Sequence, residues 1–408
     1  MRTVGVVVVG SKEPSYLSTA TASKIPLRHK AFVKVIQMFE LLCFFLLLVL
    51  NLSTGGVGGF LVVHKVDGSD GSLTGEKCNF PAVFSFGDSN WDTGAISAAY
   101  GQMPPPPIEQ TISGKPSGRF CDGRLIIDYI AMELGLPYLR AYLDPLGPGT
   151  FNNGANFGTG GSSVEKRGYS VFDLSVQVSQ FRQFKSRIIG SYNYTDQQQG
   201  EVNLPKPEDF SEALYTFDIG QNDISFGLQQ TSERETRASI PRILNKFSEV
   251  LQQLYNDGAR VFWVHNTGPV GCLPYSSIYY PKKSGNLDKN GCVIPMNEIA
   301  QEFNKQLKSK LVDAYSAKYN LINSAESKGF VDPLDFCCGS YYGIHVGCGE
   351  MVTVNGTVYG KPCANPEAHI SWDGIHYSEA ANHWIAKYII NGSMSDSSIP
   401  INQACHAL

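Results

Sequence analysis

Short apolar runs alternate along this chain with segments whose apolar residues have helical spacing. The runs are Ala82–Phe86, Leu214–Ile219 and Val261–Val264, and each has the length and composition of a buried strand. Between the last two runs, five apolar residues form one helical face that ends at Gly258: Ile243, Phe247, Val250, Leu251 and Leu254. This alternation predicts an α/β fold with a mainly parallel sheet and helices on both faces, joined by right-handed crossovers.

The alternation continues toward the C-terminus. A second helical face is made by Ile299, Phe303, Leu307 and Leu311, and Leu321-Ile322 is expected to begin the next strand. No linker, repeat or low-complexity block divides the sequence, so we expect one domain over residues 78–395 and a C-terminal tail over 396–408. The proline run Pro104–Pro107 is expected to be a stiff loop near the face that carries the site.

Residues with catalytic potential follow the first run and precede the last helical pattern. Ser89 lies in a turn directly after Ala82–Phe86, and Asp373 lies three residues before His376. A serine, a histidine and an aspartate are the components of a nucleophile, base and orienting triad. The alternatives are an ordinary turn at Ser89, a helix cap at Asp373 and a surface histidine at His376.

Two further segments lie between these residues. Gly154–Gly161 is rich in glycine, which permits close backbone approach, and Gly220-Gln221-Asn222-Asp223 follows the second apolar run. The side-chain amide of Asn222 can donate hydrogen bonds without becoming charged. A flexible loop is the alternative for the glycine-rich segment, whereas a phosphate-binding loop would need a Lys-Ser/Thr pair that is missing here.

The four segments in this order resemble the GDSL esterase/lipase family of the SGNH hydrolase superfamily, in its plant form, from about Cys78 to about Ile390. The resemblance implies a three-layer α/β/α sandwich of the flavodoxin-like kind. It also implies that Ser89 is the nucleophile, His376 the base and Asp373 its partner, with Ser89, Gly161 and Asn222 forming the oxyanion hole. No cofactor and no metal are implied.

Other segments fit this resemblance without adding chemistry. Asn90 stands where leucine often follows the family's serine, and the change is not at a triad position. Gly268–Pro274 is interpreted as a structural turn. Four other histidines are expected to be ordinary loop or helix residues: His265, His345, His369 and His383. A substrate contact is the alternative for His369.

Several classes of protein are disfavoured. The sequence has no Gly-x-Ser-x-Gly elbow of standard α/β-hydrolases, and neither His-Glu-x-x-His nor Cys-x-x-Cys supports a zinc site. The net charge of −4 gives no reason to expect nucleic-acid binding.

The N-terminal region predicts secretion. Leu41–Leu50 is a ten-residue apolar run preceded by basic residues, which is typical of a signal-peptide core and short for a bilayer span. We therefore expect residues 1–60 to be an extension and signal peptide, with Met38 as an alternative start, and a mature protein beginning between Ser53 and His64. The expected location is extracellular, in the apoplast or cell wall. The alternative is an N-terminal type II anchor in the Golgi or endomembrane lumen.

Cysteines and sequons agree with secretion. Nine cysteines lie beyond Cys43, and four of them cluster at Cys337, Cys338, Cys348 and Cys363. They are expected to pair in an oxidising compartment, and the odd count leaves at least one thiol unpaired or linked elsewhere. Cys272 and Cys292 flank a polar loop between a strand and a helix and are predicted to form a disulfide. Glycosylation sequons begin at Asn193, Asn355 and Asn391.

These features favour a secreted serine carboxylic-ester hydrolase. Cys78–Ala82, Ile219–Asp223 and Cys337–Gly339 resemble a plant subgroup that contains early nodulin-like proteins, proteins named α-L-fucosidases and acetylesterases. That resemblance implies a small-molecule or polysaccharide ester, most simply an acetyl group on a carbohydrate or glycosylated metabolite. The alternatives are an acyltransferase or a lipase using the same triad, and a secreted carbohydrate-binding protein without catalysis. No membrane span is expected in the mature form, and the oligomeric state stays open.

Overall fold

The computed structural model describes residues 4–8, 77–101, 118–144, 146, 150–195, 203–280, 285–308, 315–393 and 399–407. All of these residues belong to one structural unit. The expected signal-peptide core, the alternative start at Met38, the expected cleavage region and the Pro104–Pro107 run lie outside them. No helix among the described residues is both long and apolar enough to cross a membrane.

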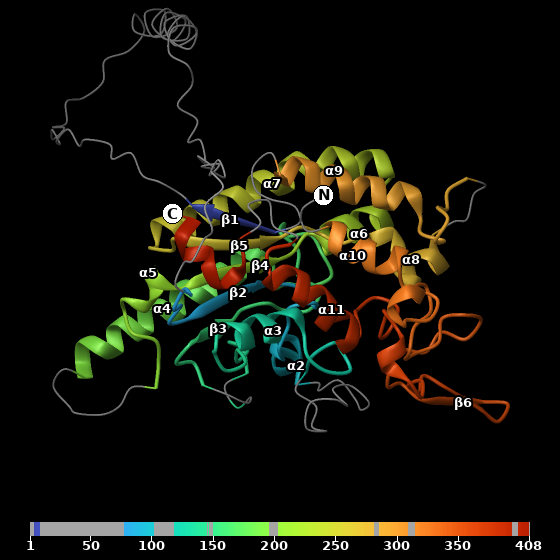
Figure 1. The fold of residues 1–408 in the computed structure, drawn as a ribbon, viewed down its shortest axis with the longest axis horizontal. Helices are drawn as coiled ribbons and strands as arrows, with labels where there is room; N and C mark the ends of the chain where they lie inside the picture. The colour runs from blue at the N-terminus through green and yellow to red at the C-terminus, as the bar shows by residue number, and fades with distance from the viewer. Residues whose placement is uncertain are drawn as a thin grey trace, which may run out of the picture. The chain divides into compact units, whose positions relative to one another are not determined.

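The centre of the unit is a sheet whose order is β1-β5-β4-β2-β3 (Figure 1). Its strands are β1 (Val4–Val8), β2 (Val83–Gly87), β3 (Gly154–Asn156), β4 (Leu214–Asp218) and β5 (Val261–His265). The last four are mutually parallel, which confirms the predicted sheet type, whereas β1 pairs with β5 in antiparallel orientation and forms one edge of the sheet. This upstream strand was not expected from the sequence.

Helices cover both faces of the sheet. They are α2 (Ala95–Tyr100), α3 (Ile126–Glu133), α4 (Leu174–Thr195), α5 (Asp209–Glu212), α6 (Gln221–Gln230), α7 (Glu233–Asn256), α8 (Pro274–Tyr279), α9 (Ile294–Lys308), α10 (Tyr315–Asn323) and α11 (Glu379–Ile390). Every residue of β2, β4 and β5 is buried, so these strands are largely apolar on both faces rather than alternating. Their polar residues include Ser85 and Thr216, whose side chains hydrogen-bond to each other at 3.0 Å.

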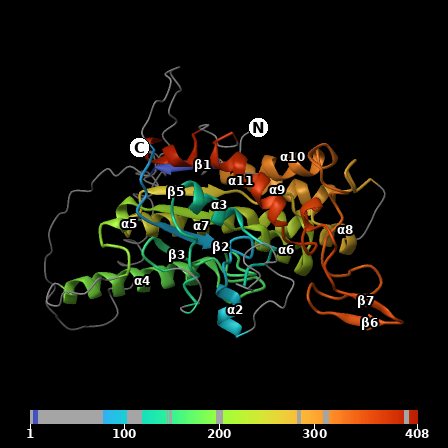
Figure 2. The ribbon, with the colours of Figure 1, turned by 60° about the horizontal axis from the view of Figure 1, so that its bottom comes forward.

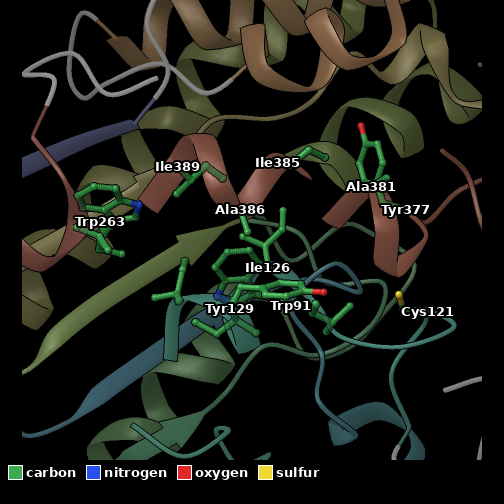
Figure 3. Packing of buried hydrophobic residues seen from close by; sticks show 14 of the residues in the cluster. Trp91, Cys121, Ile126, Tyr129, Trp263, Tyr377, Ala381, Ile385, Ala386 and Ile389 are labelled. Carbon is green, nitrogen blue, oxygen red and sulfur yellow. The ribbon is translucent and has the colours of Figure 1, made fainter. Parts of the chain in front are cut away.

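Alternate strand residues face different helical layers. Val83, Leu214 and Trp263 belong to an apolar cluster with α3, α10 and α11, and Figure 3 shows Ile126 of α3 and Ile385 of α11 within it. On the other face the core is aromatic: ring centroids lie 5.2 Å apart for Phe84 and Phe181 of α4, and 5.6 Å apart for Phe217 and Phe247 of α7. Helices on both faces give the expected three-layer sandwich.

Helix boundaries follow local chemistry. Ser232 begins α7, its side chain accepting a hydrogen bond from Glu235 N–H while the Glu235 carboxylate accepts one from Ser232 N–H. Gly258 lies just beyond the end of α7 with φ of 107°, a conformation that favours glycine. Ser378 caps α11 by accepting a hydrogen bond from Ala381 N–H.

One expected strand is wrong. Leu321 and Ile322 lie in helix α10 and are buried against the α3 and α11 layer. Two adjacent apolar residues are compatible with either a strand start or a buried helical face, and here packing selects the helix. The expected helical face of Ile299, Phe303 and Leu307 lies in α9, whereas Leu311 is outside the described residues.

Disulfides hold the C-terminal third of the unit. Cys337 pairs with Cys363 and Cys338 with Cys348, so the clustered cysteines are joined to one another. The hairpin of β6 (Val352–Val354) and β7 (Thr357–Tyr359) lies in this region and extends away from the central sheet (Figure 2).

Two more disulfides join distant segments. Cys272 is bonded to Cys292, the pair expected from the sequence, and Cys78 to Cys405. The segment expected to be a tail forms a 3-10 helix over Ile401–Ala407, and its Ile401 and Ala404 are buried in the main core. Among the described cysteines, Cys121 is the free one, and it is buried.

Candidate active site

Ser89 lies in a constrained turn at the carboxyl end of β2. A Cβ at Gly87 would lie 2.6 Å from the carbonyl oxygen of Asp218, so only glycine fits this close approach to β4. Asp88 N–H donates to the same carbonyl oxygen at 3.2 Å. The Asp88 carboxylate accepts the N–H of Asn90 at 3.0 Å, and this bond brackets Ser89, whose exposed fraction is only 8%. The serine is therefore presented on a rigid turn.

Asp373 and His376 form a hydrogen-bonded pair. His376 Nδ1 lies 2.7 Å from Asp373 Oδ2, and the other carboxylate oxygen accepts the backbone N–H groups of Ile375 and His376. Burial alone would raise the pKa of Asp373, but the interaction with His376 and these N–H donors hold it below its ordinary value. An ionised carboxylate only accepts, so Nδ1 carries the hydrogen and Nε2 keeps its lone pair.

Two aromatic residues, Tyr341 and Phe120, contact the loop that carries this pair. Tyr341 Oη donates to the Asp373 carbonyl oxygen at 2.7 Å. Gly374 has φ of 89°, and a Cβ there would lie 2.8 Å from the Tyr341 ring. The Phe120 ring stacks on His376 with centroids 5.1 Å apart. The imidazole is therefore held by both hydrogen bonding and packing.

Gly161 and Asn222 approach the serine from two other segments. Gly161 has φ of 74°, a left-handed conformation that suits glycine. Asn222 lies in the first turn of α6, just past β4, and its Nδ2 donates to the Ser162 carbonyl oxygen at 2.8 Å. An amide nitrogen carries two hydrogens, so this bond fixes the side chain and leaves one donor available.

A cavity of about 670 Å³ brings these groups together. Ser89, Gly161, Asn222 and His376 all line it, although they come from segments spread over almost 290 residues of the chain. Asp373 lies behind His376. The rest of the wall is largely aromatic and apolar and includes Phe120, Tyr169, Leu228, Leu273, Tyr275, Tyr279, Tyr280, Met296 and Ile375.

The four histidines expected to be ordinary loop or helix residues are not among the described residues that line the cavity. His265 is fully buried at the end of β5, His383 stacks on Tyr129, and His345 contacts Tyr279. His369 pairs with Asp335 at 3.4 Å and is not among the described residues that line the cavity. Although it lies near the sulfur atoms of two cysteines, those atoms are joined in a disulfide and are not available as thiolate ligands.

Several side chains around the site gave no distinct signal in the sequence. The Asp92 carboxylate accepts the N–H of Gly160 at 2.7 Å, next to Gly161. The Asp223 carboxylate accepts the N–H groups of Val164 and Glu165. Asp223 lies within the Gly220–Asp223 segment, and Asp92 lies three residues after Ser89. Neither position in the sequence indicates a contact with the 160–165 loop.

Comparisons with known proteins identify the family. Residues 83–389 match the family model described as GDSL-like lipase/acylhydrolase. A GDSL esterase/lipase of Arabidopsis thaliana is 48% identical over 352 residues, covering 82% of this chain and 93% of the relative. The GDSL esterase/lipase ACHE of Zea mays is 45% identical, with 82% and 91% covered. Alpha-L-fucosidase 3 of Arabidopsis thaliana is 42% identical, with 79% and 93% covered.

The family match covers three quarters of the chain and spans every residue of the site. Ser89, Gly161, Asn222, Asp373 and His376 all lie between residues 83 and 389. Fold, site and comparisons thus agree: this chain belongs to the GDSL-like lipase/acylhydrolase family, together with plant GDSL esterase/lipases, and is a hydrolase that acts on ester bonds.

Proposed function

We propose that the enzyme hydrolyses its ester through a Ser89–His376–Asp373 triad and an acyl-enzyme. The observation that carries this proposal is the 2.7 Å bond between His376 Nδ1 and Asp373, made by a histidine that lines the same cavity as Ser89. Ser89 Oγ attacks the ester carbonyl carbon as His376 Nε2 takes the hydroxyl proton. Asp373 keeps the imidazole in the required tautomer and stabilises the imidazolium.

The oxyanion of the tetrahedral intermediate is assigned to the N–H groups of Ser89 and Gly161 and the amide of Asn222. These neutral donors are held before substrate arrives, so little reorganisation is needed when charge develops. Collapse of the intermediate breaks the bond to the alcohol, which receives the proton from His376. Water then attacks the acyl-enzyme with His376 again as base, which frees Ser89 and the carboxylic acid.

For the substrate, we favour an acetyl ester of a carbohydrate or glycoside. A cavity of about 670 Å³ is much larger than an acetyl group, so most of it is available to the alcohol part of the ester. Its tyrosines can stack on sugar rings while their hydroxyl groups bond to sugar hydroxyls. A relative in this family bears the name of a fucosidase, which points to a sugar-containing substrate in the group.

A lipase is the second candidate. Leu228, Leu273, Met296 and Ile375 give the cavity apolar wall that would accept an alkyl chain. The two candidates differ in their response to acyl length. A short acyl pocket predicts a steep fall in kcat/KM from C2 to C8 p-nitrophenyl esters, because each methylene without room costs about 1–3 kcal/mol.

The test begins with a fluorophosphonate probe and Ser89→Ala. The wild-type protein should be labelled at Ser89, and the variant should lose both labelling and at least about 10³-fold of its hydrolysis of p-nitrophenyl acetate. Retained activity in the variant would remove Ser89 from the mechanism. Absence of labelling and of ester turnover would instead favour the carbohydrate-binding alternative.

Substrate assays on the same preparation then separate the acyl donors. Acetate release from acetylated xylan or acetylated saccharides supports the deacetylase, whereas a rate that rises with chain length and no acetate release supports the lipase. Product analysis with an added alcohol separates hydrolysis from acyl transfer, because only a transferase yields a new ester.

We also propose that the protein is secreted and glycosylated. Four disulfides among the described residues agree with an oxidising compartment. The three sequon asparagines, Asn193, Asn355 and Asn391, are exposed. N-terminal sequencing of protein from culture medium should find a start between Ser53 and His64, and such a mature chain would lack β1 and have β5 at the edge of its sheet. A membrane-bound form that retains Leu41–Leu50 would favour the type II anchor instead.

A further inference from the structure

A lysine outside the catalytic motifs is buried beneath the site. The side chain of Lys318 in α10 is 3% exposed, and its Nζ lies 3.7 Å from Asp218 Oδ2, whose side chain is 4% exposed. Burying an ammonium group is costly unless its charge is balanced and its position is fixed. Burial lowers the pKa of Lys318, but Asp218, Tyr377 and Asp88 outweigh this and raise it, so the group stays charged.

The carboxylate that Lys318 meets belongs to the strand that supports the nucleophile turn. Asp218 ends β4 and is the register partner of Gly87 at the end of β2. Its carbonyl oxygen accepts Asp88 N–H at 3.2 Å, directly before Ser89. The Asp88 side chain is also buried, and its Oδ2 has no hydrogen-bond partner among the described residues. Lys318 therefore lies beside two carboxylates just under the Ser89 turn.

Lys318 also contacts the histidine side of the site. Its Nζ lies over the ring of Tyr377, 5.2 Å from the centroid, and Tyr377 directly follows His376. A Cβ at Gly268 would lie 2.9 Å from Lys318 Cδ and 3.4 Å from Tyr377 Oη. Glycine at this position thus leaves room for both side chains. The ammonium group of Lys318 thus contacts one residue that supports Ser89 and one that supports His376. Ser89 and His376 themselves are almost 290 residues apart in the sequence.

The other titratable groups of this cluster do not replace Lys318. His265 ends β5 as the register partner of Asp218, and both of its ring nitrogens lack partners among the described residues. Burial, followed by the charge of Lys318, lowers the pKa of His265 to about 3, so it stays neutral. Burial and Asp218 raise the pKa of Asp88 to about 7, against the opposing effects of Asn90 N–H, Lys318 and His376.

We propose that Lys318 is a positioning residue for ester hydrolysis. Its buried ammonium group ties Asp218 at the end of β4 to Tyr377 beside His376 and thereby sets the placement of Ser89 relative to the base. The inference rests on the proposed triad and goes beyond it, because no catalytic motif contains Lys318. A displacement of about 1 Å in such a site can cost roughly 100-fold in rate, so support of this kind has measurable consequences.

The test is a double-mutant cycle of Lys318→Met, Asp218→Asn and the combined variant. Lys318→Met removes the charge and keeps the length of the side chain. We expect kcat on p-nitrophenyl acetate to fall roughly 10- to 100-fold while KM changes less than about threefold. The rate of fluorophosphonate labelling of the folded protein should fall in parallel. Lys305→Met, the same change at an exposed position of α9, should leave both rates unchanged.

The combined variant separates positioning from simple destabilisation. It removes the ammonium group together with the Asp218 carboxyl group, whose pKa is raised by burial against the opposing effect of Lys318. The proposal therefore predicts at least about fivefold more activity than the product of the single effects. If Lys318→Met does not fold, the combined variant, with its charges balanced, is expected to fold and to retain that activity. The inference is overturned by a folded Lys318→Met with wild-type kcat and labelling rate, or by single effects that multiply in the combined variant.

These outcomes are distinct from a failure of the triad. If Ser89→Ala keeps its activity, the proposed mechanism is lost whatever Lys318 does. If Ser89→Ala is inactive and the Lys318 cycle shows no coupling, the triad stands and only the positioning role is lost.

Discussion

At the scale of single residues, the site depends on donors and acceptors whose second interactions hold them in place. Asn222 uses one amide hydrogen on the Ser162 carbonyl oxygen, and Asp373 uses one carboxylate oxygen on two backbone N–H groups. The second amide hydrogen of Asn222 is left available for the proposed oxyanion hole. The second carboxylate oxygen of Asp373 bonds to His376. Substitutions at these positions therefore affect placement as well as chemistry.

Asn222→Ala should lower kcat by roughly 10²–10³, the cost of one oxyanion donor. The expected change in KM is small, because the donor acts on charge that develops after binding. Steady-state kinetics on p-nitrophenyl acetate measure both parameters. Raised KM with unchanged kcat would move Asn222 from the oxyanion hole to ground-state binding.

The pair of Asp373 and His376 predicts a defined pH dependence. Burial lowers the pKa of His376, but Asp373, with smaller contributions from Asp88 and Asp92, raises it above its ordinary value. Since the base must be neutral, kcat/KM should fall as the pH drops through this raised pKa. Asp373→Asn should move the acid limb to lower pH and lower the plateau by roughly 10²–10⁴. A limb that does not move would show that another group controls it.

At the scale of elements, two loops of the candidate site are held by side chains from other parts of the chain. The N–H groups of the 160–165 loop are bound by Asp92 before α2 and by Asp223 in α6. The 373–376 loop is bound by Tyr341, which lies between the disulfide-linked Cys338 and Cys348. Each of these two loops is thus held by a side chain that is distant from it in sequence.

Tyr341→Phe tests the anchor of the histidine loop. It removes the hydrogen bond to the Asp373 carbonyl oxygen and keeps the ring against Gly374, so kcat should fall about 2- to 10-fold, the equivalent of one hydrogen bond. Tyr342→Phe is the matched control, because Tyr342 is adjacent in sequence and 66% exposed. Equal kinetics for the two variants would argue against the anchor.

At the scale of the whole molecule, the two ends of the hydrolase unit are joined. Cys78 precedes β2, Cys405 lies in the last 3-10 helix, and their disulfide spans a sequence separation of 327 residues. Loop-closure arguments give a bridge of this span a contribution of about 6 kcal/mol, above the typical range of about 2–4 kcal/mol. The bridge and the buried Ile401 make the C-terminal segment part of the unit's stability.

The double variant Cys78→Ser/Cys405→Ser should therefore unfold at a lower temperature by roughly 5–10 °C. Its kcat at 25 °C should stay near the wild-type value, since neither cysteine is among the described residues that line the cavity. Thermal unfolding followed by circular dichroism, with kinetics on the same preparation, checks both expectations. An unchanged Tm would mean that core packing alone holds the ends together.

Local pattern was enough to predict the parallel sheet and the segments that meet at its edge. The runs before Ser89 and Asn222 are strands because fully buried parallel strands need apolar residues on both faces, a requirement visible in sequence. The same reasoning was wrong at Leu321-Ile322, where two apolar residues are too few to distinguish a strand from the buried face of α10.

Sequence alone predicts the strands β2, β4 and β5, the helical faces in α7 and α9, and the residue types available for ester chemistry, because these depend on local pattern and motif. It does not predict β1, β3 or the helix α10. Packing in three dimensions selects the distant groups that support the site. Tyr341 reaches Asp373, Asp92 reaches Gly160, and Lys318 reaches Asp218 across separations with no periodic signature. Such contacts are set by how helices pack on the sheet, since burial brings together side chains that have no local reason to be neighbours.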